Sequence, residues 1–178
     1  AELQMEAVRE RFAERRQQIK VLDKRAKETG TEQIESLDDL VPLLFAHTNY
    51  KSYPEVFIDN GQWQLMNLWL GSLSTYDTSG IDVSGVEDVD DWIDACHAAG
   101  HYIYASSGTS GKSSFLNQTQ QDRDYCVPAC LAAFDLSTPG FKPDHGRSVF
   151  TMMPDKGTHK MTEVSTAHFS RWAAPGEF

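Results

Sequence analysis

A cluster of hydroxyl side chains and glycines lies near the middle of the chain and ends in a lysine. It comprises Ser106, Ser107, Gly108, Thr109, Ser110, Gly111 and Lys112. Glycine lets the backbone turn through conformations that other residues avoid, and a turned backbone directs several N–H groups at one point. Such a concavity suits an anion; the four hydroxyl groups add hydrogen-bond donors, and the lysine adds a positive charge. The cluster is therefore a candidate phosphate-binding loop, and the alternative is a Ser/Gly-rich surface hairpin.

The residues on both sides of the cluster predict the elements that position it. An apolar, alternating run predicts a strand over residues 101–105, and a second short run predicts a strand over 113–117. Thr119 and Asp122 have the spacing of a capping box, which predicts a helix from Gln120 to about Phe134. We therefore expect strand, loop, strand and helix in that order.

Two families of nucleotide-binding proteins have loops of this kind. The P-loop pattern G-x-x-x-x-G-K-[ST] matches Gly111, Lys112 and Ser113, but it requires glycine where Ser106 stands. A P-loop also needs its helix to begin at Lys112, where the sequence instead favours a strand.

The loop resembles that of the adenylate-forming superfamily more closely. That loop reads as an apolar residue, two free positions, then S/T-S/T-G-T-T/S-G-x-P/S-K. The matching residues are Ile103, Ser106, Ser107, Gly108, Thr109, Ser110, Gly111 and Ser113. Ser114 departs from the pattern, because the superfamily usually has Lys or Arg there, and Lys112 would have to substitute for it. The resemblance covers residues 100–135 well and residues 1–100 loosely.

The resemblance implies a fold and a reaction. The fold would be α/β, with helices packed on a small mixed sheet, as in the N-terminal part of the large domain of acyl-CoA synthetases, acyl-protein synthetases and phenylacetate–CoA ligases. ATP and Mg²⁺ are the implied cofactors. A carboxylic acid would attack the α-phosphate of ATP to give acyl-AMP and pyrophosphate, and the thiol of coenzyme A or of a carrier protein would then take the acyl group.

In this interpretation loop 106–114 holds the ATP phosphates. The chain is expected to be the N-terminal portion of such an enzyme and to be inactive alone, because the later segments of that superfamily are not found in it. The alternative function is a non-catalytic docking or scaffold module with a relic loop.

The rest of the chain predicts mostly helices. Residues 2–29 predict one long helix that ends at Gly30, with an apolar stripe that packs either on its own domain or on a partner protein, including a second copy. We expect this helix to make up the first unit of the chain, residues 1–30, and a partial α/β domain to span residues 31–178. Further helices are predicted at Ser36, where Asp39 completes a capping box, and over 62–73, 87–99 and 158–172, with a buried strand over 148–153.

Charge and cysteine content narrow the class of protein. The net charge is −10, and residues 1–30 carry eight basic and six acidic groups (+2), which leaves −12 for the rest. This acidity argues against a nucleic-acid surface, and no apolar run is long enough to span a bilayer. Three cysteines, Cys96, Cys126 and Cys130, are an odd number without framework spacing, which predicts a reducing, cytoplasmic setting.

Overall fold

The computed structural model describes residues 2–106, 108, 111–137, 140, 144–152 and 160–176. In these ranges the chain forms helices and one two-stranded antiparallel sheet. The elements, in chain order, are the helices α1 (Glu2–Gln18) and α2 (Lys20–Thr29), the 3₁₀ helices η1 (Leu37–Leu43) and η2 (Asn49–Lys51), the helices α3 (Glu55–Asp59), α4 (Trp63–Ser72) and α5 (Val89–Ala98), the strands β1 (His101–Ala105) and β2 (Phe115–Thr119), and the helices α6 (Gln120–Ser137) and α7 (Lys160–Phe169).

The N-terminal segment forms a helical hairpin instead of the single helix predicted over 2–29, so that prediction is wrong. The helix breaks at Ile19, whose backbone is extended with φ −104° and ψ 103°. The break lets α1 and α2 pack on each other, so that Phe12 and Ala26 enter one core together with Ile34 and Leu43. The apolar stripe thus buries on its own segment, and the core continues past the boundary expected at residue 30. Gly30 ends α2 in the left-handed conformation, as predicted.

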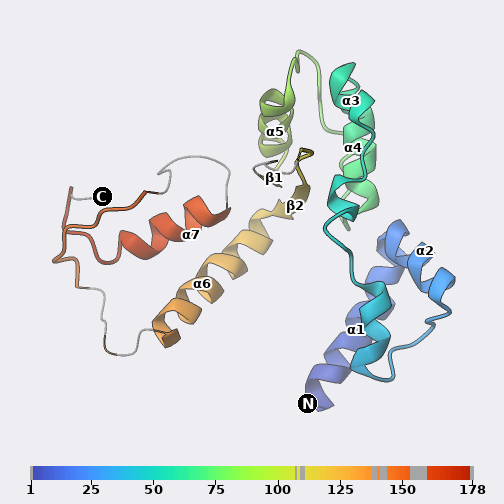
Figure 1. The fold of residues 1–178 in the computed structure, drawn as a ribbon, viewed down its shortest axis with the longest axis horizontal. Coiled ribbons are helices and arrows are strands. Elements are labelled where there is room, and N and C mark those ends of the chain that lie inside the picture. Colours follow the sequence, from blue (N-terminus) through green and yellow to red (C-terminus); the bar gives the residue numbers. More distant parts are fainter. Residues whose placement is uncertain are drawn as a thin grey trace.

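A second core lies in the centre of the molecule, where α4 and α5 pack against the strands (Figure 1). Its buried members are Tyr53, Trp63, Met66, Leu70, Ile81, Trp92, Ile93, Cys96, Ile103 and Phe115. Two polar residues, Asn67 and Thr78, are fully buried beside them. Trp92 Nε1 donates to Asn67 Oδ1 over 2.8 Å, Asn67 Nδ2 donates to the Ile81 carbonyl over 3.1 Å, and Thr78 Oγ1 donates to the Asn67 carbonyl. Because buried polar groups are costly unless paired, this network fixes α4 against α5.

Capping bonds are present at three helix starts, and the two capping boxes predicted from the sequence, at Ser36 and at Thr119, are confirmed. Ser36 and Asp39 form the predicted capping box of η1, and the Asp88 carboxylate accepts the Asp90 and Asp91 amides at the start of α5. At α6 the Asp122 carboxylate accepts the Thr119 amide over 2.9 Å. These bonds satisfy N–H groups that the first helical turn leaves without partners.

The C-terminal helices extend away from the sheet. Figure 1 shows α6 running from β2 away from the central core, with α7 beside it, and the centroid of the Phe134 ring in α6 lies 4.6 Å from that of the His168 ring in α7. The strand predicted over 148–153 is wrong for the described residues 148–152, because Phe150 and Met152 are 96% exposed. Only an isolated bridge joins Arg147 to Ala173, and an apolar run needs a neighbouring strand to complete its hydrogen bonds.

Helix length and apolar character bear on whether a segment can enter a membrane. Within the ranges that the structure describes, no helix could cross one.

Candidate functional site

The candidate loop connects the two strands of the hairpin. In the antiparallel register Ala105 pairs with Phe115, and the next pair, Ser106 and Ser114, closes the loop with two bonds. Ser106 N donates to the Ser114 carbonyl over 3.0 Å, and Ser114 N donates to Ser106 Oγ over 2.8 Å. Ser106 therefore fixes the mouth of the loop, and its hydroxyl proton is still available to donate.

This geometry differs from that of a P-loop. The second strand begins at Phe115, two residues later than predicted, and α6 begins only at Gln120. A P-loop needs a helix that starts at its lysine. The order of strand, loop, strand and capped helix is the one predicted from the sequence.

Both glycines of the loop have backbone conformations that favour glycine. Gly108 has φ +64° and Gly111 has φ +105°, and Gly111 N donates to the Gly108 carbonyl over 2.7 Å. A Cβ at Gly108 would lie 2.8 Å from Ser113 Oγ and 3.1 Å from the Gly111 carbonyl oxygen. The loop therefore requires glycine at 108 for both its dihedral angle and its close contacts.

Lys112 does not extend into solvent. Its Nζ donates to the carbonyl oxygen of Tyr53 and lies 4.0 Å from the centroid of the Tyr53 ring. An ammonium attracted to an aromatic face is a cation–π contact. The side chain of Lys112 is half-buried, so this contact fixes the position of the only cation in the loop.

Tyr53 also holds the residue after the lysine. Its hydroxyl donates to the Ser113 carbonyl over 2.9 Å, and burial, followed by the charge of Glu55, raises the pKa of Tyr53, which keeps that proton in place. The ring is 2% exposed and contacts Trp69 and Phe115 at centroid distances of 5.0 and 5.3 Å. Tyr53 thus ties the loop to the central core.

Sequence reasoning missed Tyr53. It stands 59 residues before Lys112 in an aromatic stretch, and no local pattern links the two positions. Of the predicted site residues, Ser106, Gly108, Gly111 and Lys112 lie together in the hairpin. Ser107, Thr109 and Ser110 lie outside the described residues.

The loop is not suited to hold a metal ion of its own. Mg²⁺ prefers carboxylate and phosphate oxygens, and residues 106–114 contain no carboxylate. Across the described part of the chain, no group of three His, Cys, Asp or Glu side chains could hold a metal ion. The Mg²⁺ implied by the sequence resemblance would therefore have to be bound by phosphate oxygens of the nucleotide.

A separate polar hollow of about 390 Å³ lies between the hairpin of α1 and α2 and the central body. Gln18 and Lys20 line one side, and α4 with the loop of residues 74–79 lines the other. Two hydrogen bonds from Ser79 are the main causes that lower the pKa of Asp77 in this loop. The hollow is the alternative to the glycine loop as a binding site for a small polar ligand.

Cys96, Cys126 and Cys130 are not joined in disulfides. Burial raises the pKa of Cys96 to about 12, which keeps this thiol protonated and unreactive.

Comparison of the chain with protein-family models, curated proteins and solved structures finds no match. The function is therefore inferred from the loop residues and their geometry.

Proposed function

We propose that loop 106–114 binds the phosphates of ATP in an enzyme that activates a carboxylic acid as an acyl-adenylate, and that this chain supplies the N-terminal portion of that enzyme. The observation that carries the proposal is the loop itself: two glycines with positive φ, a serine that closes the mouth and a half-buried lysine, between two strands and a capped helix.

Each loop residue has a task in this proposal. Gly108 and Gly111 bring backbone amides close to the phosphates, Ser106, Ser107, Thr109 and Ser110 donate hydroxyl hydrogen bonds, and Lys112 supplies positive charge. When the carboxylate attacks the α-phosphate, charge builds on the departing pyrophosphate. Donors that are already oriented toward that charge stabilise it without further reorganisation.

The experiment is calorimetric titration of this chain with ATP and Mg²⁺. We expect saturable binding in the wild type and at least about tenfold weaker binding in Lys112→Ala, because a charge-assisted hydrogen bond contributes about 1.5–3 kcal/mol.

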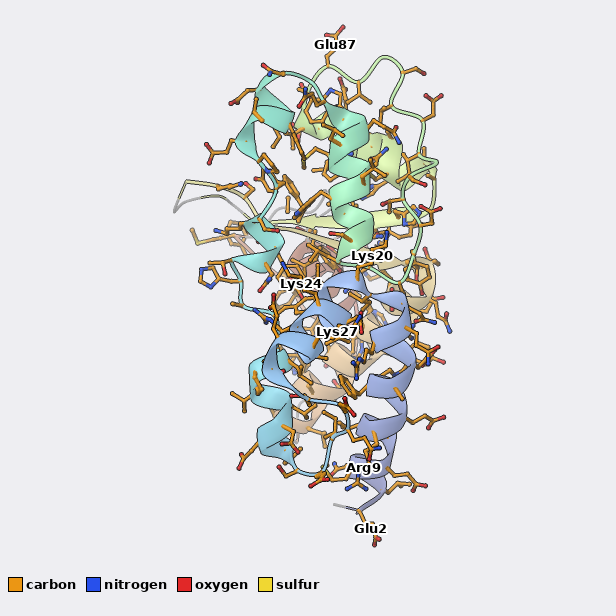
Figure 2. The ribbon with its side chains drawn as sticks, turned by 90° about the vertical axis from the view of Figure 1, so that its right-hand side faces the viewer. Glu2, Arg9, Lys20, Lys24, Lys27 and Glu87 are labelled. Atoms are coloured by element: carbon orange, nitrogen blue, oxygen red, sulfur yellow. The ribbon has the colours of Figure 1, made fainter. Side chains whose placement is uncertain are left out.

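Lys24→Ala is the matched control. It removes the same charge from an exposed position on α2, where Lys24 faces Glu28 at 3.7 Å (Figure 2). If Lys112→Ala and Lys24→Ala bound ATP equally well, the loss of affinity would come from the change in net charge and not from the loop. Absence of nucleotide binding in the wild type would leave the docking module as the better interpretation.

A further inference from the structure

Tyr53 lies outside the loop but contacts both the loop cation, Lys112, and the next residue, Ser113. Tyr53 contacts Lys112 in two ways, through its backbone carbonyl and through its ring, and it contacts Ser113 through its hydroxyl. All three contacts join residues about 60 positions apart in the sequence. They converge on two adjacent residues near the end of the loop, just before β2.

We propose that Tyr53 is a positioning residue for the phosphate loop, holding the Lys112 ammonium ready to receive a polyphosphate. This inference rests on the proposed function. It goes further by assigning the placement of the cation to a residue that the loop pattern does not contain.

The contacts that hold Lys112 leave its charge available. An ammonium has three N–H donors, and the Tyr53 carbonyl uses one of them. The ring and the carbonyl are both neutral, so they orient the ammonium without cancelling its charge, whereas a carboxylate partner would compete with the phosphate. With one N–H on the carbonyl and one directed at the ring, one donor remains for a phosphate oxygen.

Packing against neighbouring aromatic rings holds the Tyr53 side chain in place. Its ring lies edge-on to Trp69 and tilted against Phe115, and Trp69 Nε1 donates to Ser52 Oγ over 2.9 Å. Holding a flexible lysine in advance lowers the conformational entropy that is lost when a ligand binds. Tyr53 should therefore affect affinity for phosphate without touching it.

The test combines titration with NMR spectroscopy, and its ligand probe is tripolyphosphate with Mg²⁺, which presents the phosphates without a nucleoside. Tyr53→Leu removes the ring and the hydroxyl but keeps the backbone carbonyl. We expect it to weaken tripolyphosphate binding about three- to tenfold, the range of a partly desolvated cation–π contact. Tyr53→Phe restores the ring, and we expect its affinity to lie closer to the wild type than to the leucine variant.

A spectroscopic signature separates positioning from general destabilisation. Protons held over an aromatic face resonate upfield, so the Lys112 side-chain signals should shift upfield in the wild type and in Tyr53→Phe and lose that shift in Tyr53→Leu. Ile81→Ala is the control, because it removes buried volume from the same core and Ile81 bonds Asn67, not the loop.

Each outcome decides a different point. Unchanged affinity in Tyr53→Leu, or an equal loss in Ile81→Ala, would overturn the positioning role while leaving the proposed function intact. No tripolyphosphate binding by the wild type, with the Lys112 signals still upfield, would overturn the proposed function and this inference with it.

Discussion

At the scale of single residues, the loop combines strict backbone requirements with one well-placed charge. Gly108 leaves no room for a Cβ beside Ser113 and Gly111, and Lys112 lies over Tyr53. The net charge of the chain is −10, so an anion is repelled at long range and must be attracted locally. A cation held by neutral groups is one way to provide that local attraction.

The requirement for glycine at 108 can be measured against a matched position. Gly30 has a similar φ of +70°, but a Cβ there would have nothing within 4 Å, whereas a Cβ at Gly108 would have two close neighbours. Each substitution to alanine should cost about 1–2 kcal/mol through backbone strain. We expect Gly108→Ala to cost more in urea denaturation and to speed amide exchange at Gly111, whose N–H bonds the Gly108 carbonyl. Equal costs at both positions would mean that the loop does not pack as described.

At the scale of elements, signals that act over a few residues were predictable from sequence. Thr119 and Asp122 marked the start of α6, and Gly30 marked the end of α2, because caps and stops depend on neighbouring backbone groups. The break at Ile19 was not predictable, since its reason is the distant packing of Phe12 with Ile34 and Leu43.

Structural features that depend on residues far apart in the sequence could not be predicted from the sequence pattern either. The run at 148–152 has the composition of a buried strand but lacks a partner strand, so Phe150 is exposed. For the site, local spacing predicted the hairpin and its glycines. The position of the Lys112 side chain depends instead on Tyr53, which comes close to Lys112 only when the central core folds.

The hairpin of α1 and α2 should be sensitive to acid through Asp23. Its carboxylate accepts from Lys27 over 2.6 Å and from Arg16 over 3.0 Å, and these bonds, that to Lys27 first, lower the pKa of Asp23 below its ordinary value. Because the folded pKa is depressed, the stabilisation is complete above the unfolded value and is lost as pH falls through the folded value.

This pH dependence can be measured by amide exchange of α1 and α2 between about pH 5 and pH 2, a range that brackets the ordinary aspartate pKa. We expect hairpin protection to fall with acid in the wild type. In Asp23→Asn protection should be lower at pH 5 and flatter with pH. An identical profile in the two proteins would show that the bonds of Asp23 do not stabilise the hairpin.

At the scale of the whole molecule, two separate cores support different parts of the chain. One core joins α1, α2 and η1, and the other joins α4, α5 and the strands that present the loop. Figure 2 shows Lys20, Lys24 and Lys27 along α2, with Glu87 of the central body at the far end of the molecule. The loop is therefore built on a core to which the N-terminal hairpin does not contribute.

This separation predicts that the two cores can be destabilised one at a time. Phe12→Ala removes a buried ring from the N-terminal core and should cost that hairpin about 3–5 kcal/mol. We expect amide protection to fall in α1 and α2 while Ile103 and Phe115 in the central core keep theirs. Simultaneous loss of protection in both regions would show that the chain unfolds as one unit.

The central claim is that ATP binds at the glycine loop, and amide chemical-shift mapping tests it most directly. On titration with ATP and Mg²⁺ we predict that the largest shifts occur in residues 106–114, including the amides of Gly108 and Gly111, and that Lys112→Ala reduces them. The competing place is the polar hollow lined by Lys20 and residues 74–79. Largest shifts at that hollow, with residues 106–114 unchanged, would contradict the assignment of the loop as a phosphate site.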